Sequence, residues 1–372
     1  MGSEVVPCGI SICGNPAHTR ETVATLLQQH GLHEAVSIAE SENATRFVLQ
    51  AEIARHWLPG FDTTGLAGRL NLDTHQTTVA LEKEILITLL ASPVCMDFPS
   101  VDELMAHIHI RRNIVTSGRK TELNFDTAAA ERPHDCWRYD EARGFTVKPG
   151  CSLIHALKKA TQPELSGRLY AFSCYRATEY VILLAIAKEL AVCNLPLLSQ
   201  LQAQCEMKVI RSGQFHDVFL HEYGSQESPF PASYYIPGDR VWFRNPDPSS
   251  SDVTGFEGSW VLYLGEGLFT NFWKHNHPYT LAEKCLEIYH WRHGTYRNAS
   301  GELAMDETVV ENRVADTRRD THEVARIMAQ MMRWRDPKDV YENGGCIDTT
   351  REGSRWVCPG TADLVLSPAY YE

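Results

Sequence analysis

The stretch at residues 169–191 reads LYAFSCYRATEYVILLAIAKELA and carries the clearest structural signal in the chain. From Cys174 onward it is mostly apolar, which predicts a buried helix over residues 174–191. Cys174 stands where this helix begins. A helix N-terminus lowers the pKa of a thiol, because its unpaired N–H groups and the positive end of its dipole lie beside the sulfur. The pattern makes Cys174 a candidate nucleophile, and a buried structural cysteine is the alternative interpretation.

The chain changes character downstream of this helix, from about Glu206. Short segments rich in β-branched and aromatic residues are bounded there by Gly, Pro, Asn and Asp, which is typical of strands. They are Val218–Tyr223, Arg240–Phe243, Ser259–Leu264 and Gly267–Phe272. Antiparallel strands after a buried helix predict an α+β fold. A thiolate at a helix start, followed by strands that present a base, is also the general design of papain-like cysteine enzymes.

Helices are predicted on both sides of this core. Apolar residues recur at helical spacing over 18–55, so we expect two or three short helices there. Ser100 and Glu103 form a capping-box pattern that begins a helix reaching about Ile114. The remaining predicted elements are helices at Ala80–Ala91, Ser152–Thr161, Asn276–Tyr289 and 306–335, and short strands at Cys136–Tyr139 and Gly144–Lys148.

Three units follow from this pattern. We expect an N-terminal helical unit over 1–90, a catalytic core over 91–295, and a C-terminal helix and tail over 296–372. The last ~35 residues are punctuated by Gly, Cys and Pro, a composition that indicates an appended tail.

Charge and hydropathy exclude several classes of protein. Lys and Arg number 35 against 47 Asp and Glu, so the net charge is −12. This argues against a nucleic-acid-binding protein, which needs a basic face. No apolar run approaches the ~18–20 residues that span a bilayer. The N-terminus also lacks the basic and apolar regions of a secretory signal. We therefore expect a cytoplasmic protein without membrane insertion, with export by a signal-independent route as the alternative.

The cysteines and histidines give no metal signature. There are 11 cysteines, an odd number, and no C-x-x-C pair, which favours reduced and mostly buried thiols in a reducing compartment. The pairs His275/His277 and His290/His293 lack a matching carboxylate or cysteine motif. We therefore expect neither a metal nor a cofactor.

Three stretches between residues 92 and 280 form an ordered set of motifs. The first is SPVCMDF at 92–98, then Ser100, Glu103-Leu104-Met105, Arg111 and Asn113-Ile114-Val115. The second is Tyr170-Ala171-Phe172, then Cys174 and Ala177. The third is Gly238-Asp239, Phe243, Asn245-Pro246, Gly258, Val261 and Leu264-Gly265-Glu266. In this order they resemble the bacterial protein-glutamine γ-glutamyltransferases of the spore-coat type.

The resemblance implies both a fold and a reaction. The fold is an NlpC/P60-like, papain-related core in which a buried helix carrying the cysteine packs on an antiparallel sheet. The reaction is acyl transfer from a glutamine-type carboxamide, or another activated acyl group, to a primary amine such as lysine, with loss of ammonia. Cys174 matches the position of the family's nucleophile. The partners implied are a glutamine-bearing protein or acyl substrate and a primary-amine acceptor.

Two departures from the family concern the base. The family carries a Glu directly before its cysteine and a second Glu after the glycine that matches Gly258; this chain has Ser173 and Ser259 there. Glu257 lies two residues before Ser259, and residues two apart in a strand face the same side. His275 follows the place of the family's downstream histidine, and a histidine is the common activator of a thiol. Glu257 and His275 are therefore the two candidate bases.

Other functions stay open at this stage. A glutamine deamidase or toxin-type effector on the same core would release ammonia without incorporating an amine. A binding protein that has lost catalysis would also explain the two missing carboxylates. For the candidate bases, the alternatives are an exposed strand carboxylate and a solvated loop histidine.

Overall fold

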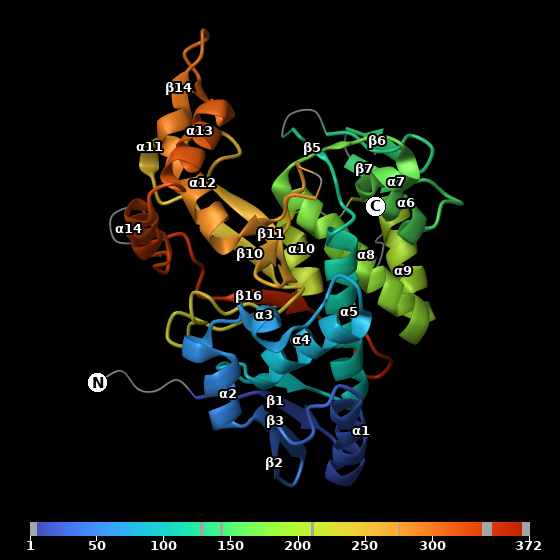
Figure 1. Ribbon diagram of the computed structural model, residues 1–372. Helices are drawn as coiled ribbons and strands as arrows, with labels where there is room; N and C mark the ends of the chain where they lie inside the picture. Colours follow the sequence, from blue (N-terminus) through green and yellow to red (C-terminus); the bar gives the residue numbers. More distant parts are fainter. Residues whose placement is uncertain are drawn as a thin grey trace.

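A long helix and the six-stranded sheet beside it organise the chain (Figure 1). The computed structural model describes residues 6–126, 130–141, 144–209, 212–274, 276–336 and 344–366. The predicted α+β class is confirmed, since helices and antiparallel sheets share the same cores. Within these described ranges, no helix combines the length and apolar character needed to cross a bilayer.

The N-terminal region contains a sheet in the order β2-β3-β1-β4. Its strands are β1 (Ile10–Cys13), β2 (Val36–Glu40), β3 (Ala44–Leu49) and β4 (Met96–Phe98). The prediction of helices alone over 18–55 is therefore wrong. Along β3 the buried residues Thr45, Phe47 and Leu49 alternate, which is the period of a half-buried strand.

Helices accompany this sheet. They are α1 (Pro16–Gln29), α2 (Ala51–Trp57), the 3-10 turn η1 (Pro59–Phe61), α3 (Leu66–Leu70) and α4 (Thr78–Leu90). The predicted helix at Ala80–Ala91 is confirmed as α4, which is buried along most of its length. The sheet pairing continues past residue 90, because β1 pairs in parallel with β4.

The centre of the molecule is the helix α8 (Cys174–Cys193), which packs against α5 (Val101–Gly118). The Ser100 hydroxyl caps α5 by accepting the N–H of Glu103 at 3.2 Å, as the capping-box pattern predicts. The remaining elements of this part are β5 (Asn124–Phe125), β6 (Trp137–Asp140), β7 (Gly144–Val147), α6 (Leu153–Thr161), α7 (Pro163–Ser166), β8 (Ala171–Phe172), α9 (Leu195–Met207) and α10 (Ser212–Phe219). Apolar side chains of α5, α6, α8, α9 and α10 share one core.

The large sheet has the order β13-β12-β11-β10-β16-β9. Its strands are β9 (Leu220–Tyr223), β10 (Arg240–Arg244), β11 (Gly258–Gly265), β12 (Leu268–Phe269), β13 (Tyr279–Thr280) and β16 (Arg351–Ser354). Along β11, Leu262 joins the core of α5 and α8, whereas Val261 and Tyr263 join a core that contains α12 (Leu281–Gly294). The sheet therefore separates the cysteine helix from α12.

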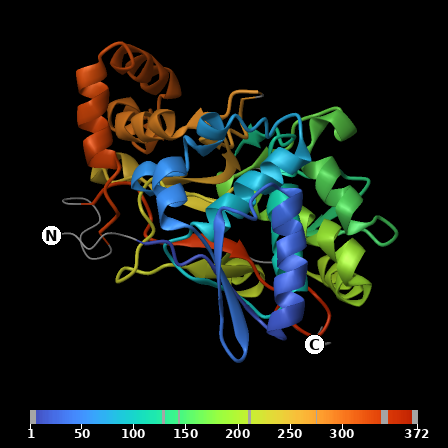
Figure 2. The same cartoon turned by 60° about the horizontal axis from the view of Figure 1, so that its bottom comes forward.

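The C-terminal region differs from its prediction in two ways. The expected helix over 306–335 is broken into α13 (Glu307–Thr317) and α14 (Thr321–Met331), because Asp320 caps a new helix with its side chain. The expected tail contains β16, which pairs with both β9 and β10 (Figure 2). The small elements left are α11 (Pro248–Ser251) and the hairpin of β14 (Thr295–Arg297) and β15 (Leu303–Met305).

Four cysteines form two disulfides, so the expectation of reduced cysteines is wrong for them. Cys8 and Cys95 precede β1 and β4, and the parallel pairing of these strands brings their Cα atoms to 4.9 Å. Cys136 and Cys151 flank the β6–β7 hairpin, with Cα atoms 5.5 Å apart. Long-range pairing, which cysteine spacing does not reveal, creates the first of these contacts across 87 residues.

Candidate active site

Cys174 is the first residue of α8, as the sequence predicts. The strand β8 delivers the chain to this point, and Ser173 then caps the helix by accepting the N–H of Arg176 at 3.3 Å. The cysteine is only partly buried, unlike most of the helix that follows. A cysteine that is partly exposed at a capped helix start has the placement of a nucleophile.

Opposing effects act on the thiol. Burial raises the pKa of Cys174, while hydrogen bonding from the backbone of Trp260 and of Tyr175 and the charges of Lys284 and Arg240 lower it; the balance stays above the usual range. The resting sulfur is therefore largely a thiol near neutral pH. A base must take its proton before it can attack a substrate.

Arg240 connects the cysteine to the large sheet. Its guanidinium lies 3.9 Å from the ring centre of Trp260 and 4.4 Å from that of Tyr175. Its Nε donates to the Thr178 hydroxyl at 3.0 Å, and one terminal nitrogen donates to Glu352 at 3.0 Å. The arginine is buried, so this positive charge acts on Cys174 through protein rather than through water.

The structure brings β11 to the cysteine. Trp260, whose backbone interacts with Cys174, directly follows Ser259, the position where the family has a carboxylate. β11 begins at Gly258. Only glycine fits at this position, because a Cβ would lie 2.3 Å from Trp242 Nε1. The strand that carries Ser259 therefore lies beside Cys174.

The two candidate bases are placed differently. Glu257 is exposed and lies just before β11, where its carboxylate accepts the N–H of Gly255 at 3.2 Å. The alternation of strand side chains does not extend to a residue outside the strand, so it does not direct Glu257 toward the cysteine. His275 lies outside the described residues.

Aromatic side chains join the segment before α8 to the loops of the large sheet. Phe125 of β5 lies 5.1 Å from Trp273 and 6.2 Å from Phe256, measured between ring centres. β5 pairs in parallel with β8, which ends two residues before Cys174. These rings therefore bridge the two sides of the region around the cysteine.

Two cavities flank this region. One, of about 380 Å³, is lined by Asp126, Ala130, Arg132, Phe172, Ser173, Tyr175 and Arg176. It includes both sequence neighbours of Cys174 and two arginines. The other, of about 490 Å³, has aromatic walls that include Trp273 and Tyr279. Its charged lining consists of Glu283, Glu287, Glu307 and Glu311 together with Lys274 and Arg318, which pair with Glu311 and Glu283. Carboxylates outnumber basic side chains there, whereas the first cavity contains two arginines and one aspartate.

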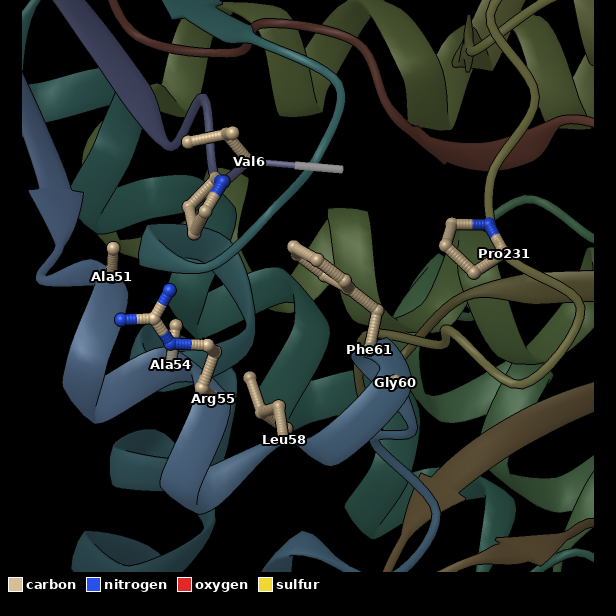
Figure 3. Close-up of a pocket in the computed structure, with 9 residues that line it drawn as sticks. Val6, Ala51, Ala54, Arg55, Leu58, Gly60, Phe61 and Pro231 are labelled. Atoms are coloured by element: carbon tan, nitrogen blue, oxygen red, sulfur yellow. The ribbon is translucent and has the colours of Figure 1, made fainter. Parts of the chain in front are cut away.

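A third cavity lies in the N-terminal region (Figure 3). It measures about 470 Å³ and is lined mainly by apolar residues of α2 and η1, together with Pro231. No residue of α8 or β11 contributes to it, so it is separate from the cysteine. Among the described residues, no group of three His, Cys, Asp or Glu side chains is placed to hold a metal ion.

Sequence reasoning missed three charged residues around the cysteine. Lys284 lies on α12 and is buried, with its ammonium 3.6 Å from the ring centre of Tyr279. Arg240 and Glu352 meet across β10 and β16. No local pattern marks these residues, because each becomes part of the site through contacts with distant parts of the chain.

Comparison with known proteins identifies the family. A sequence model described as protein-glutamine gamma-glutamyltransferase matches residues 65–364. The chain belongs to this family. The family and the enzyme activity expected from the sequence, acyl transfer between a glutamine side chain and an amine, are thereby confirmed, and the match does not favour the deamidase or the inactive binding protein.

Two known proteins illustrate the distance within the family. The protein-glutamine gamma-glutamyltransferase of Halalkalibacterium halodurans is 25% identical over 241 residues, which cover 61% of this chain and 75% of that protein. The solved transglutaminase from Geobacillus stearothermophilus, without its C-terminal extension, is 18% identical with a TM-score of 0.38. That match covers 57% of this chain and 98% of the solved chain.

Proposed function

We propose that Cys174 is the nucleophile of this transglutaminase. The observation that carries the proposal is its position at the capped start of α8, against the backbone of Trp260 on β11. A helix that presents a thiol to an antiparallel sheet also supports the finer fold prediction, an NlpC/P60-like, papain-related core.

The reaction proceeds in two steps. The Cys174 sulfur attacks the carbonyl carbon of a glutamine side chain while a base takes the thiol proton. The C–N bond breaks, the proton passes to the leaving nitrogen, and ammonia departs to leave a thioester. A base takes one proton from the bound ammonium, and the neutral amine attacks the thioester carbon. The C–S bond breaks as the C–N bond forms, and a second proton passes from the amine nitrogen to the cysteine sulfur. Water in place of the amine would give deamidation.

The two flanking cavities suit the two substrates. Burial and the neighbouring carboxylates Glu287 and Glu311 raise the pKa of Glu307. Glu311, Glu287 and Glu283 pair with Lys274, Lys284 and Arg318. A further cation beside Glu307 would relieve the remaining repulsion, so the aromatic cavity suits the protonated amine acceptor. The cavity beside Ser173 and Tyr175 is then the approach for the glutamine-bearing donor.

Replacement of the cysteine tests the proposal. Cys174→Ala should abolish incorporation of a fluorescent primary amine into a glutamine-bearing protein, with a loss of roughly 10³-fold or more, while the circular dichroism spectrum stays unchanged. The matched control is Cys13→Ala, since Cys13 is exposed and unpaired by any disulfide. Residual activity above about a tenth of the wild-type rate would contradict a covalent role.

The base is tested by a matched pair of variants. If Glu257 serves, Glu257→Gln should lower the rate by roughly 10²–10⁴ and His275→Ala should have little effect. If His275 serves, the losses are reversed, and the pH–rate profile should rise near ~6.5. We favour His275, because a neutral imidazole both takes the thiol proton and returns it to ammonia. Near-wild-type activity in both single variants and in the double variant would exclude both residues.

A further inference from the structure

The free cysteines of this chain are not scattered. Besides the two disulfides, the described cysteines are Cys13, Cys174 and Cys205, and four that form two close pairs. Both pairs join one segment, residues 344–366, to helices distant in the sequence. We call this stretch the C-terminal segment; it contains β16.

The first pair is Cys285 with Cys346. Their sulfur atoms are 3.7 Å apart, and both residues are fully buried. Cys285 lies on α12, while Cys346 is held by its backbone: its N–H donates to Met331 at 2.9 Å and its carbonyl accepts from Arg244 at 2.9 Å. The thiols therefore meet between two fixed backbones, at one end of the C-terminal segment.

The second pair is Cys193 with Cys358, at the other end of the segment. Each thiol affects the pKa of the other, and the backbone contacts that follow bring the two residues side by side. Cys193 is the last residue of α8, and its neighbour Asn194 donates to the Val357 carbonyl at 2.8 Å. Glu103 fixes the opposite side by accepting the backbone N–H of Val357 at 3.0 Å and of Cys358 at 2.7 Å.

We propose that Cys285–Cys346 and Cys193–Cys358 are two further disulfide sites, which fasten both ends of the C-terminal segment to the core. A disulfide needs a sulfur–sulfur distance of about 2.0 Å, so the first pair has only a short approach to make. Between the two sites lies β16, whose Glu352 binds Arg240 beside the catalytic centre. Oxidation would therefore fix the segment that completes the charged surroundings of Cys174.

The chemistry requires an oxidant, and a small disulfide such as oxidised glutathione supplies it. One cysteine thiolate attacks this disulfide, forms a mixed disulfide and releases one glutathione thiolate. The second cysteine then displaces the other glutathione, and two protons leave the protein. Cys193 is partly exposed and is the natural point of entry, whereas the buried Cys285–Cys346 pair reacts during folding or local opening.

The experiment uses the full chain with oxidised glutathione as the probe. After oxidation the protein is unfolded, its remaining thiols are alkylated, and its peptides are mapped by mass spectrometry without reduction. We expect the 285–346 and 193–358 cross-links in addition to the two disulfides already formed, with Cys13 and Cys205 alkylated. The thermal midpoint of the oxidised wild type should exceed that of the thiol form by roughly 3–8 °C.

Variants assign the cross-links and guard against a folding defect. Cys346→Ser should remove only the first cross-link and Cys358→Ser only the second, whereas the exposed control Cys13→Ser should remove neither. The oxidised and reduced wild type provide the comparison that needs no variant. Alkylation of Cys285 and Cys346, or of Cys193 and Cys358, after oxidation would overturn the corresponding site. Confirmed cross-links would also argue against the expected cytoplasmic location, because disulfides persist in oxidising compartments.

Discussion

Helix α8 and the C-terminal segment both contribute to the surroundings of Cys174, yet their sequences differ in what they reveal. α8 is specified locally: Ser173 caps it, and an apolar run buries it on all sides. The segment around β16 is polar and rich in glycine, so its composition indicates a tail. It nevertheless forms an interior strand of the large sheet, because it pairs with β10 on one side and β9 on the other.

The glycines of the segment explain the misleading composition. A Cβ on Gly345 would lie 2.1 Å from the Arg333 carbonyl oxygen, and one on Gly353 would lie 3.0–3.2 Å from Tyr223, Arg111 and His107. Both positions require glycine because the segment packs in close contact with the residues on either side of it. The position of Cys174 therefore depends on local sequence, whereas its electrostatic surroundings depend on contacts between distant elements.

Replacing Arg240 should break this assembly most severely. Arg240→Met leaves the largely buried Glu352 with His216 but without its arginine, so the free energy of unfolding should fall by about 3 kcal/mol. Denaturant titration measures the loss. The control Arg319→Met removes an arginine whose side chain is 79% exposed and should cost less than about 0.5 kcal/mol. Equal losses in the two variants would mean that the buried pair does not hold the segment.

Glu352→Gln should have a smaller effect. The amide keeps a hydrogen-bond acceptor for Arg240 but loses the charge, so we expect a loss of about 1–3 kcal/mol in unfolding free energy. Glu222→Gln is the control, since Glu222 is the exposed neighbour of Glu352 in the register of β9 and β16. In the double variant that combines Glu352→Gln with Arg240→Met, the unfolding free energy should fall by less than the sum of the two single losses. Strict additivity would show that the two residues act separately.

Features that depend on local sequence could be predicted, whereas features that depend on contacts between distant elements could not. The position of Cys174, the capped start of α5 and the strand that carries Ser259 were predictable, because each depends on a pattern within about ten residues. The helical interpretation of 18–55 failed where an alternating strand also placed apolar residues three or four apart. Lys284, Arg240 and Glu352 were unpredictable, since their proximity arises from contacts between distant elements.

The pH dependence of stability should reveal how the segment is held. Burial would raise the pKa of Glu352, but His216 and Arg240 outweigh this effect and hold it below its usual range. In return, the hydrogen bond between His216 and Glu352 raises the pKa of His216 above the usual range of a histidine. The carboxylate's contribution is present above its unfolded pKa of ~4.3 and is lost as the pH falls through the lowered folded value. The histidine's contribution is complete below ~6.5 and is lost as the pH rises through the raised folded value.

Thermal midpoints measured across pH test this assignment. In the wild type the thermal midpoint should decline as the pH rises above ~6.5. His216→Asn should remove this part of the decline, because the substituted amide does not titrate. His322→Asn, on the exposed side of α14, should leave the wild-type curve unchanged. A His216→Asn curve parallel to that of the wild type would show that this histidine does not stabilise the segment through its charge.

The smallest expected effect concerns the local specification of α8. Ser173→Ala removes a side-chain cap, so the unfolding free energy should fall by about 0.5–2 kcal/mol. Ser152→Ala removes the equivalent cap of α6, where the hydroxyl accepts the N–H of His155 at 3.3 Å, and should cost a similar amount. Only Ser173→Ala should also slow iodoacetamide alkylation of Cys174, because fraying of α8 at its first turn weakens the contact between the sulfur and the Trp260 backbone. If both variants alkylate at the wild-type rate, the cap stabilises the helix but does not position the nucleophile, and that role passes to the long-range contacts of β11.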